Sequence, residues 1–474
     1  AGAAAWLGLP LTPATLAVLP VVLGLSTDYL LQAANRLAEE RGSPADRFRR
    51  MARAILPATG LAAAATAAGV LAFAVSSLPL LRQFGLFLAL GVAMSWLASV
   101  LVGLPLLALL ARRVPAVAAG RSRSGKALVR LSRLPRYAAL MLVMAGIAGW
   151  AALMSVRVET DPARLMPAGS PSLRQVAQVR SATGVTGEMD VVVTGPDVTS
   201  PQVVAWMGNR EQALKGAGLV PLNGLPNFVL AFNYGQAPDA AATKKMLDAL
   251  PPYFTGSVVS QDHHVAVITL GQTHLDSAEQ DQALTARVTA AISRPPAGYR
   301  AYPAGLAVIA SEALGALQAG QLRLNVIALG LVLLVLVVSY RRLLPALVVV
   351  TPTVAAAGWV TAAMAATGAR QTPITVLLAG VIVAFATEFG VLWVSRYREQ
   401  REAGDPAEKA SETASLRVGP AILAAAAALV AAFGVLGVSP VPMVRDFGLW
   451  CAADLAVATA AVLVLLPPAA RTLL

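Results

Sequence analysis

The stretch LPLLRQFGLF at residues 78–87 returns, with small changes, as VPMVRDFGLW at residues 441–450. In the same register Pro57 falls on Pro420. Self-similarity at a fixed offset is the sequence signature of an internal repeat. Because both copies lie among long apolar runs, we predict two equivalent bundles of membrane helices that run in the same sense across the bilayer, as parallel repeats do.

The composition supports a membrane protein. Of 474 residues, 57% are hydrophobic and 13% charged, whereas a soluble domain carries roughly a quarter charged residues. Several stretches exceed the ~20 apolar residues that cross a bilayer core. We expect nine complete spans, at roughly 14–36, 54–77, 84–111, 137–156, 324–340, 343–366, 374–395, 418–438 and 447–469.

The net charge of +12 does not indicate nucleic-acid binding, because the basic residues gather in short segments beside the apolar runs. That distribution follows the positive-inside rule and predicts that these segments are cytoplasmic, where they also attract anionic membrane lipids. The segments are residues 36–53, 112–136, 341–342 and 396–417. We interpret residues 112–136 as a basic cytoplasmic linker between the two halves.

Residues 157–322 are more polar than the rest of the chain. Strand-like pieces, such as VVVTG at 191–195 and VAVITL at 265–270, alternate with helix-like pieces. This alternation predicts an α+β domain with those two strands as neighbours, and the flanking spans place it on the extracytoplasmic side. Residues 306–340 contain no proline, and we expect them to form one nearly continuous helix.

The repeat also aligns two acids within apolar spans. With a slightly different offset, GLSTDY at residues 24–29 meets AFATEF at 384–389, so that Asp28 falls on Glu388. An ionised acid at this depth costs at least ~2.5–3.5 kcal/mol, so it persists either as a paired structural group or because its charge is used. A structural acid would be protonated and bonded to a neighbouring helix. Matched acids in both halves favour a proton or cation relay.

Neighbouring polar residues extend this candidate relay. Thr27 and Thr387 also match in the repeat, and either could bond a carboxyl or guide water. Tyr29 has a phenol able to bridge toward the acid of the other half, whereas its counterpart, Phe389, has none. A third acid, Asp454, lies in the last span and could join the relay or satisfy a polar neighbour.

The Asp-Tyr pair within a span, its repeat partner and the large insert resemble the resistance–nodulation–division (RND) superfamily. The insert opens with VETDPARLMPAGSPSLRQ at residues 158–175, which is similar to the branch of MmpL-like and hopanoid or hydrophobe exporters. Each half of such proteins has one span, an insert and five further spans. The resemblance therefore implies that earlier parts of the protein precede this chain.

On that plan residues 1–111 hold the tail of the third span and spans four to six. Residues 137–156 are span seven, and residues 323–474 hold spans eight to twelve. The resemblance implies proton-driven export of lipids or other hydrophobic molecules across a bacterial inner membrane, with Asp28 and Glu388 carrying the protons. MmpL-type members pair Asp-Tyr with Asp-Tyr, and the Glu-Phe of this chain departs from that pattern.

Two other functions share this architecture: a non-transporting lipid receptor with a sterol-sensing bundle, and an accessory motor for protein secretion. The matched acids favour the transporter, since a receptor needs no proton path. The sequence contains no enzyme motif and no phosphate-binding loop. It also lacks a zinc-binding pattern around His263, His264 and His274. We therefore expect neither an enzyme nor a cofactor or metal site. The substrate and the oligomeric state, including a homo-oligomer, stay open.

Overall fold

The computed structural model describes residues 18–110, 127–130, 133–156, 158–159, 162–167, 169–185, 187–215, 218–232, 239–273, 278–372 and 374–474. The chain divides into two compact units. Residues 1–158 and 317–474 form the first, here called the helix bundle, and residues 159–316 form the second, the insert domain. The fold class expected from the sequence, a membrane helix bundle with an internal repeat plus an α+β domain, is confirmed.

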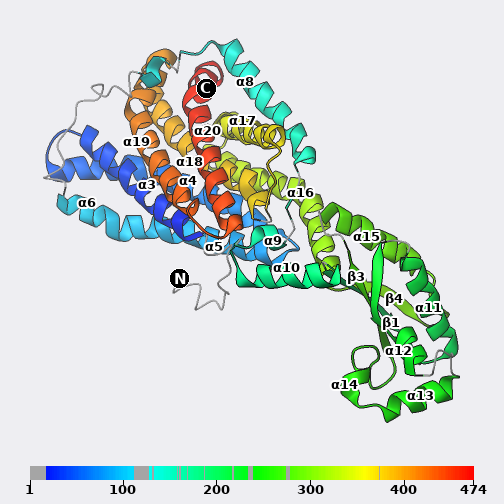
Figure 1. The fold of residues 1–474 in the computed structure, drawn as a ribbon. Helices are drawn as coiled ribbons and strands as arrows, with labels where there is room; N and C mark the ends of the chain where they lie inside the picture. Colours follow the sequence, from blue (N-terminus) through cyan, green and yellow to red (C-terminus); the bar gives the residue numbers. More distant parts are fainter. Residues whose placement is uncertain are drawn as a thin grey trace. The chain divides into compact units, whose positions relative to one another are not determined.

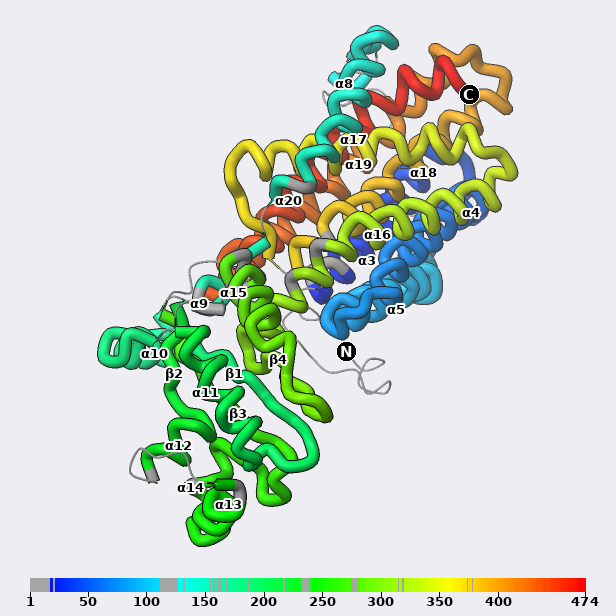
Figure 2. The backbone as a smooth tube through the Cα atoms, turned by 90° about the vertical axis from the view of Figure 1, so that its right-hand side faces the viewer, coloured from blue at the N-terminus to red at the C-terminus, as the bar shows by residue number. Residues whose placement is uncertain are grey.

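The bundle consists of long helices that lie side by side (Figures 1 and 2). They are α3 (Val18–Glu39), α4 (Pro44–Leu71), α5 (Pro79–Ala98), α6 (Leu104–Leu110), α8 (Arg136–Gly149), α16 (Leu306–Tyr340), α17 (Leu343–Thr367), α18 (Leu378–Glu402), α19 (Ala407–Leu436) and α20 (Pro442–Leu473). Short 3-10 or π segments are η1 (Ala72–Val75), η2 (Ser99–Gly103), η3 (Trp150–Ser155) and η4 (Thr375–Leu377).

Within the described residues, eight helical segments are long and apolar enough to cross a membrane, and they match eight of the nine predicted spans. The ninth predicted span, at 14–36, corresponds to α3, of which the structure describes Val18–Glu39. Asp28, Gln32 and Asn35 interrupt the apolar residues of this helix. Those polar residues are the ones from which the candidate site is built.

The repeat recurs in the helix boundaries and in the packing. Helices α4 and α19 begin at Pro44 and Ala407, and helices α5 and α20 begin at Pro79 and Pro442, each pair separated by the offset of the two sequence stretches. Packing is reciprocal, because α3 lies against α19 while its counterpart α18 lies against α4. Such an exchange of partners is what a two-fold relation between the halves requires.

One aromatic contact lies where the two halves meet. Phe84 and Phe447, the equivalent phenylalanines of the two repeated stretches, are both fully buried. Their rings meet edge to face with centroids 6.0 Å apart. Only residues close to an approximate two-fold axis can contact their own repeat partners, so this pair places the axis within the bundle.

Helix α18 is the innermost element of the bundle, and it carries Glu388. Every residue from Leu378 to Val394 is buried, which fits a helix that is apolar on all sides. Its neighbours are α4, α17, α19 and α20 (Figure 1). A helix surrounded in this way holds Glu388 out of contact with the lipid.

The insert domain is built on an antiparallel sheet with strand order β2-β3-β1-β4. The strands are β1 (Gly187–Thr194), β2 (Leu219–Gly224), β3 (Val265–Gln272) and β4 (Arg300–Ala304). The helices are α9 (Pro162–Leu165), α10 (Pro171–Thr183), α11 (Pro201–Lys215), α12 (Leu225–Phe232), α13 (Ala240–Ala249), α14 (Pro252–Thr255) and α15 (Ala278–Ala291). Alternate residues of β1 and β3, among them Val191 and Ile268, pack with α11 and α15 in one apolar core.

Two predictions for the insert are confirmed. The VVVTG and VAVITL segments are neighbouring antiparallel strands, with Val191 opposite Ile268 and Thr194 opposite Val265. Helix α16 runs without interruption from Leu306 to Tyr340, so it contributes residues to both compact units. Most of the predicted linker at 112–136 lies outside the described residues, as does His274.

Candidate functional site

The two predicted acids both lie inside the bundle. Asp28 on α3 and Glu388 on α18 are each 1% exposed. Each precedes an arginine of its own helix, Arg36 or Arg396, by eight residues, which corresponds to ~12 Å along the axis. The equal spacing places both carboxyls at the same depth from the end of the bundle at which these arginines lie.

The carboxyls of Asp28 and Glu388 are near enough to interact electrostatically. The charge of Asp28 acts on Glu388, and the buried phenol of Tyr29 is influenced by both. The Tyr29 hydroxyl lies beside Glu388 without a hydrogen bond of standard geometry. The structure therefore brings together three of the predicted site residues, with the phenol of one half beside the acid of the other.

Hydrogen bonding of the acids is incomplete. Gln32 donates from Nε2 to Asp28 Oδ1 over 3.2 Å. Asp28 Oδ2 and Glu388 Oε1 accept no hydrogen bond from any described protein group. Buried polar atoms are nearly always paired, so carboxylate oxygens left without protein partners on facing helices mark a site with a use beyond packing.

The two threonines do not lie with the carboxyls as the sequence interpretation expected. Thr27 is on the exposed surface of α3, and its hydroxyl donates to the carbonyls of Leu23 and Gly24. Thr387 is buried, but its hydroxyl donates to the carbonyl of Val383 on its own helix. Backbone bonding of this type is common for threonine in helices and leaves no hydroxyl proton for a carboxyl.

Asp454 is buried in α20 and stands apart from the central pair. Its electrostatic influence falls on Cys451, one turn earlier on the same helix, and its Oδ1 accepts no hydrogen bond from a described group. Within the described residues, no hydrogen bond joins Asp454 to Asp28 or Glu388. The structure does not bring this third acid into the candidate relay.

A ring of ion pairs, absent from the sequence interpretation, joins the halves where α3 and α18 end. Arg36 binds Glu399 with both terminal nitrogens, at 2.6 and 3.2 Å. Arg396 in turn binds Glu39 at 2.7 Å and Glu399 at 2.8 Å. Arg36 and Arg396 are repeat partners, and so are Glu39 and Glu399. We call these four residues the Arg–Glu ring.

The residues of the Arg–Glu ring can be recognised in the sequence as part of the repeat. ANRLAE at residues 34–39 aligns with VSRYRE at 394–399 in the offset that pairs the two acids, so each half supplies an arginine and, three residues later, a glutamate. Both residues lie on one face of a helix end at that spacing. That each arginine would cross to the glutamate of the other half could be known only from the packing of α3 near α18.

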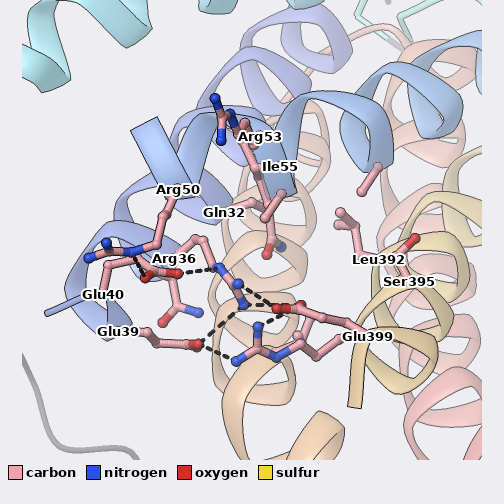
Figure 3. A pocket seen from close by; sticks show the side chains of 15 residues that line it. Gln32, Arg36, Glu39, Glu40, Arg50, Arg53, Ile55, Leu392, Ser395 and Glu399 are labelled. Atoms are coloured by element: carbon pink, nitrogen blue, oxygen red, sulfur yellow. Dashed lines mark hydrogen bonds and ion pairs between the residues drawn. The ribbon is translucent and has the colours of Figure 1, made fainter. Parts of the chain in front are cut away.

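The Arg–Glu ring lines a cavity of about 420 Å³. Its wall includes Gln32 as well as Ile55, Leu392 and Ser395. Figure 3 shows the ion-paired side chains gathered together, with Gln32 and Leu392 apart from them. Because Gln32 also bonds Asp28, the cavity and the buried carboxyl share this one amide.

A sequence model of the MMPL family matches residues 3–165 and 231–474. The chain belongs to the MMPL family. A similar protein is MJ1562 of Methanocaldococcus jannaschii, which is described as a membrane protein. It is 24% identical over 352 residues, or 69% of this chain and 88% of the relative. The MMPL chain is also 28% identical over 188 residues to the membrane protein ActII-3 of Streptomyces coelicolor, covering 37% of this chain and 26% of the relative.

Among solved structures, the MMPL chain resembles SecDF of Thermus thermophilus, whose title describes a translocon-associated membrane protein. The TM-score is 0.61 at 16% identity, with 99% of this chain and 56% of SecDF covered. A second structure of SecDF, in a super-membrane-facing form, gives 0.56 at 15% identity, with 98% and 55% covered. The chain spans about half the length of these structures, and at this identity the likeness establishes the RND-type fold.

Proposed function

We propose that this MMPL protein is a secondary transporter that uses the proton gradient to export lipids or other hydrophobic molecules. The observation that carries the proposal is the buried cluster of Asp28, Glu388 and Tyr29 between the two halves. A desolvated carboxyl binds a proton more readily than one in water, and two carboxyls within electrostatic reach of one another favour a shared proton. Such a pair can take up and release protons as its surroundings change.

The geometry supports a relay better than a purely structural role. A structural acid would be fully hydrogen-bonded, yet each of these carboxyls has an oxygen without a protein partner. The acids also lie on different repeats, on helices α3 and α18. Movement of one repeat against the other would change the separation of the carboxyls and so couple proton binding to conformation.

The export of hydrophobic molecules, the inner-membrane location and the extracytoplasmic placement of the insert domain follow from the family resemblance and from the positive-inside distribution. The test must therefore separate transport from the lipid-receptor alternative. The SecDF structures add a secretion-associated relative of the same fold, but at 16% identity they carry no argument for that activity here.

The decisive experiment uses the full-length protein in proteoliposomes under an imposed pH gradient. Lipids that co-purify with the protein are first identified by mass spectrometry, and their efflux is then measured. Asp28→Asn and Glu388→Gln, made singly, are expected to abolish gradient-driven efflux while folding and substrate binding persist. Each amide keeps the shape and hydrogen-bonding capacity of the acid but cannot carry a proton. Undiminished efflux in both variants would reject the relay and favour a receptor.

A further inference from the structure

The two halves differ at the position one turn after each acid. In the first half this position holds Gln32, and in the second half its repeat partner is Leu392. Residues four apart lie on the same face of a helix, so each of these side chains stands beside its acid on the way to the Arg–Glu ring. An amide can hold a carboxyl or a water molecule there, whereas leucine cannot.

Gln32 connects the buried Asp28 carboxyl to the cavity beside the Arg–Glu ring. Its side chain is 3% exposed and lines the cavity of about 420 Å³, and its Nε2 donates to Asp28 Oδ1 over 3.2 Å. The far part of the cavity is lined by Arg36, Glu39 and Glu40, which are charged and held in ion pairs. Polar groups therefore line this route from the helix ends to Asp28.

Glu388 has no equivalent route among the described residues. Leu392 and, one turn further, Arg396 follow it on α18, and Glu388 Oε1 accepts no hydrogen bond from a described group. Its polar neighbours are Asp28 and Tyr29 of the other half. The cavity-lining residue one turn from Glu388 is the apolar Leu392, so no amide joins this acid to the cavity as Gln32 joins Asp28.

We propose that Gln32 is the positioning residue through which Asp28 alone exchanges protons with the end of the bundle that bears the Arg–Glu ring. The inference rests on the proposed function and assigns unequal roles to its two acids. The amide lines the cavity and bonds the Asp28 carboxyl that lies behind it. A proton leaves protonated Asp28 for water in the cavity. In the other direction, a proton taken up by Asp28 passes to Glu388 by way of the Tyr29 hydroxyl, which lies beside Glu388.

The first test measures whether water and small solutes reach position 32 from the ring side, and it does not depend on transport. Cys451, the chain's single cysteine, is replaced by alanine, and Gln32→Cys is compared with Ala33→Cys, which lies next to it on α3 but in an apolar cluster. A small, charged, membrane-impermeant thiol reagent is added to sealed vesicles of either orientation. We expect Gln32→Cys to react from the ring side only and Ala33→Cys to react from neither side. An unreactive Gln32→Cys, or one that reacts from the opposite side, would overturn the proposal.

The second test uses the repeat as its own control. Gln32→Leu gives the first half the residue of the second, and we expect gradient-driven efflux to fall by about a hundredfold or more, the lower end of what a positioned proton-transfer group contributes. Gln32→Glu should restore efflux and shift its dependence on the pH of the ring side. Adding Leu392→Gln to Gln32→Leu should not restore it, because that amide stands beside the other acid.

Wild-type efflux in Gln32→Leu, or rescue by Leu392→Gln, would contradict the assignment. The outcomes also separate this inference from the function on which it rests. If the amide variants of both acids stop efflux but Gln32→Cys is unreactive, the inference alone fails. If the amide variants transport normally, the proton-driven function fails, whatever the labelling pattern shows.

Discussion

At the scale of single residues, the central feature is a pair of carboxyls that the protein desolvates without fully bonding. Asp28 has one amide partner in Gln32, and Glu388 has the nearby phenol of Tyr29. Placing ionisable groups in a membrane is costly, and incomplete pairing raises that cost. The cost is understandable if the groups must change their protonation state, because a fully paired acid would be held in one state.

Tyr29→Phe tests the phenol at this scale. The change makes the first half resemble the second, which already carries Phe389, and removes only one hydroxyl beside Glu388. We expect gradient-driven efflux to fall by about tenfold or less, equivalent to at most ~1.4 kcal/mol in the barrier, rather than to disappear. Efflux from proteoliposomes, measured beside Asp28→Asn, supplies the comparison. A loss as complete as that of Asp28→Asn would make the phenol an obligatory carrier instead of an aid.

At the scale of helices, the repeat explains how two distant segments build one site. The reciprocal packing of α3 on α19 and of α18 on α4 brings the ends of α3 and α18 together, and the Arg–Glu ring then joins them. The two ion pairs that cross between the halves, Arg396 with Glu39 and Arg36 with Glu399, are equivalent in the repeat but differ in how deeply they are buried. In the pair of Arg396 with Glu39 the side chains are 5% and 11% exposed, against 14% and 43% for Arg36 with Glu399.

This difference predicts unequal coupling across the ring. Double-mutant cycles with alanine should give about 2–3 kcal/mol for Arg396 with Glu39, where truncating one partner leaves a buried charge, and about 1 kcal/mol or less for Arg36 with Glu399. The readout is the free energy of unfolding of the purified protein, with each single variant included. Equal coupling energies in the two pairs would show that burial does not control the strength of the ring.

At the scale of the whole molecule, the helix ends define the topology. Helix α16 leads from the insert domain to Tyr340, and Arg398 of α18 lies over the Tyr340 ring at 5.4 Å. The ends of α3, α16 and α18 are therefore at the same end of the bundle, together with the basic residues Arg341 and Arg342. The positive-inside rule predicts that this end is cytoplasmic, which is the orientation that the proposed function uses.

Labelling of single cysteines checks this topology. In the Cys451→Ala background, Glu402→Cys at the end of α18 and Lys245→Cys on α13 of the insert domain both occupy exposed positions. A membrane-impermeant reagent added to intact cells should modify the cysteine at 245 and not the one at 402, with the reverse pattern in inverted vesicles. Modification of both positions from one side would reject the proposed orientation.

The sequence by itself determined the elements of this protein. Membrane helices and the continuous α16 follow from hydropathy and from the absence of proline, and the β1–β3 pairing was predicted from two short apolar strands. The repeat also gave the matched depth of Asp28 and Glu388. These features are local or periodic, so they can be read without knowing which residues meet in space.

Only the tertiary structure decided which side chains meet. A helix has a full circle of faces, and burial depends on what packs against each face. That is why Thr27 is exposed although Thr387 is buried, why Asp454 stands apart from the central pair, and why Arg36 crosses to Glu399 as well as bonding along its own helix. The role inferred for Gln32 likewise depends on a cavity formed by α3, α4, α18 and α19, because side chains from four separate helices must leave space between them.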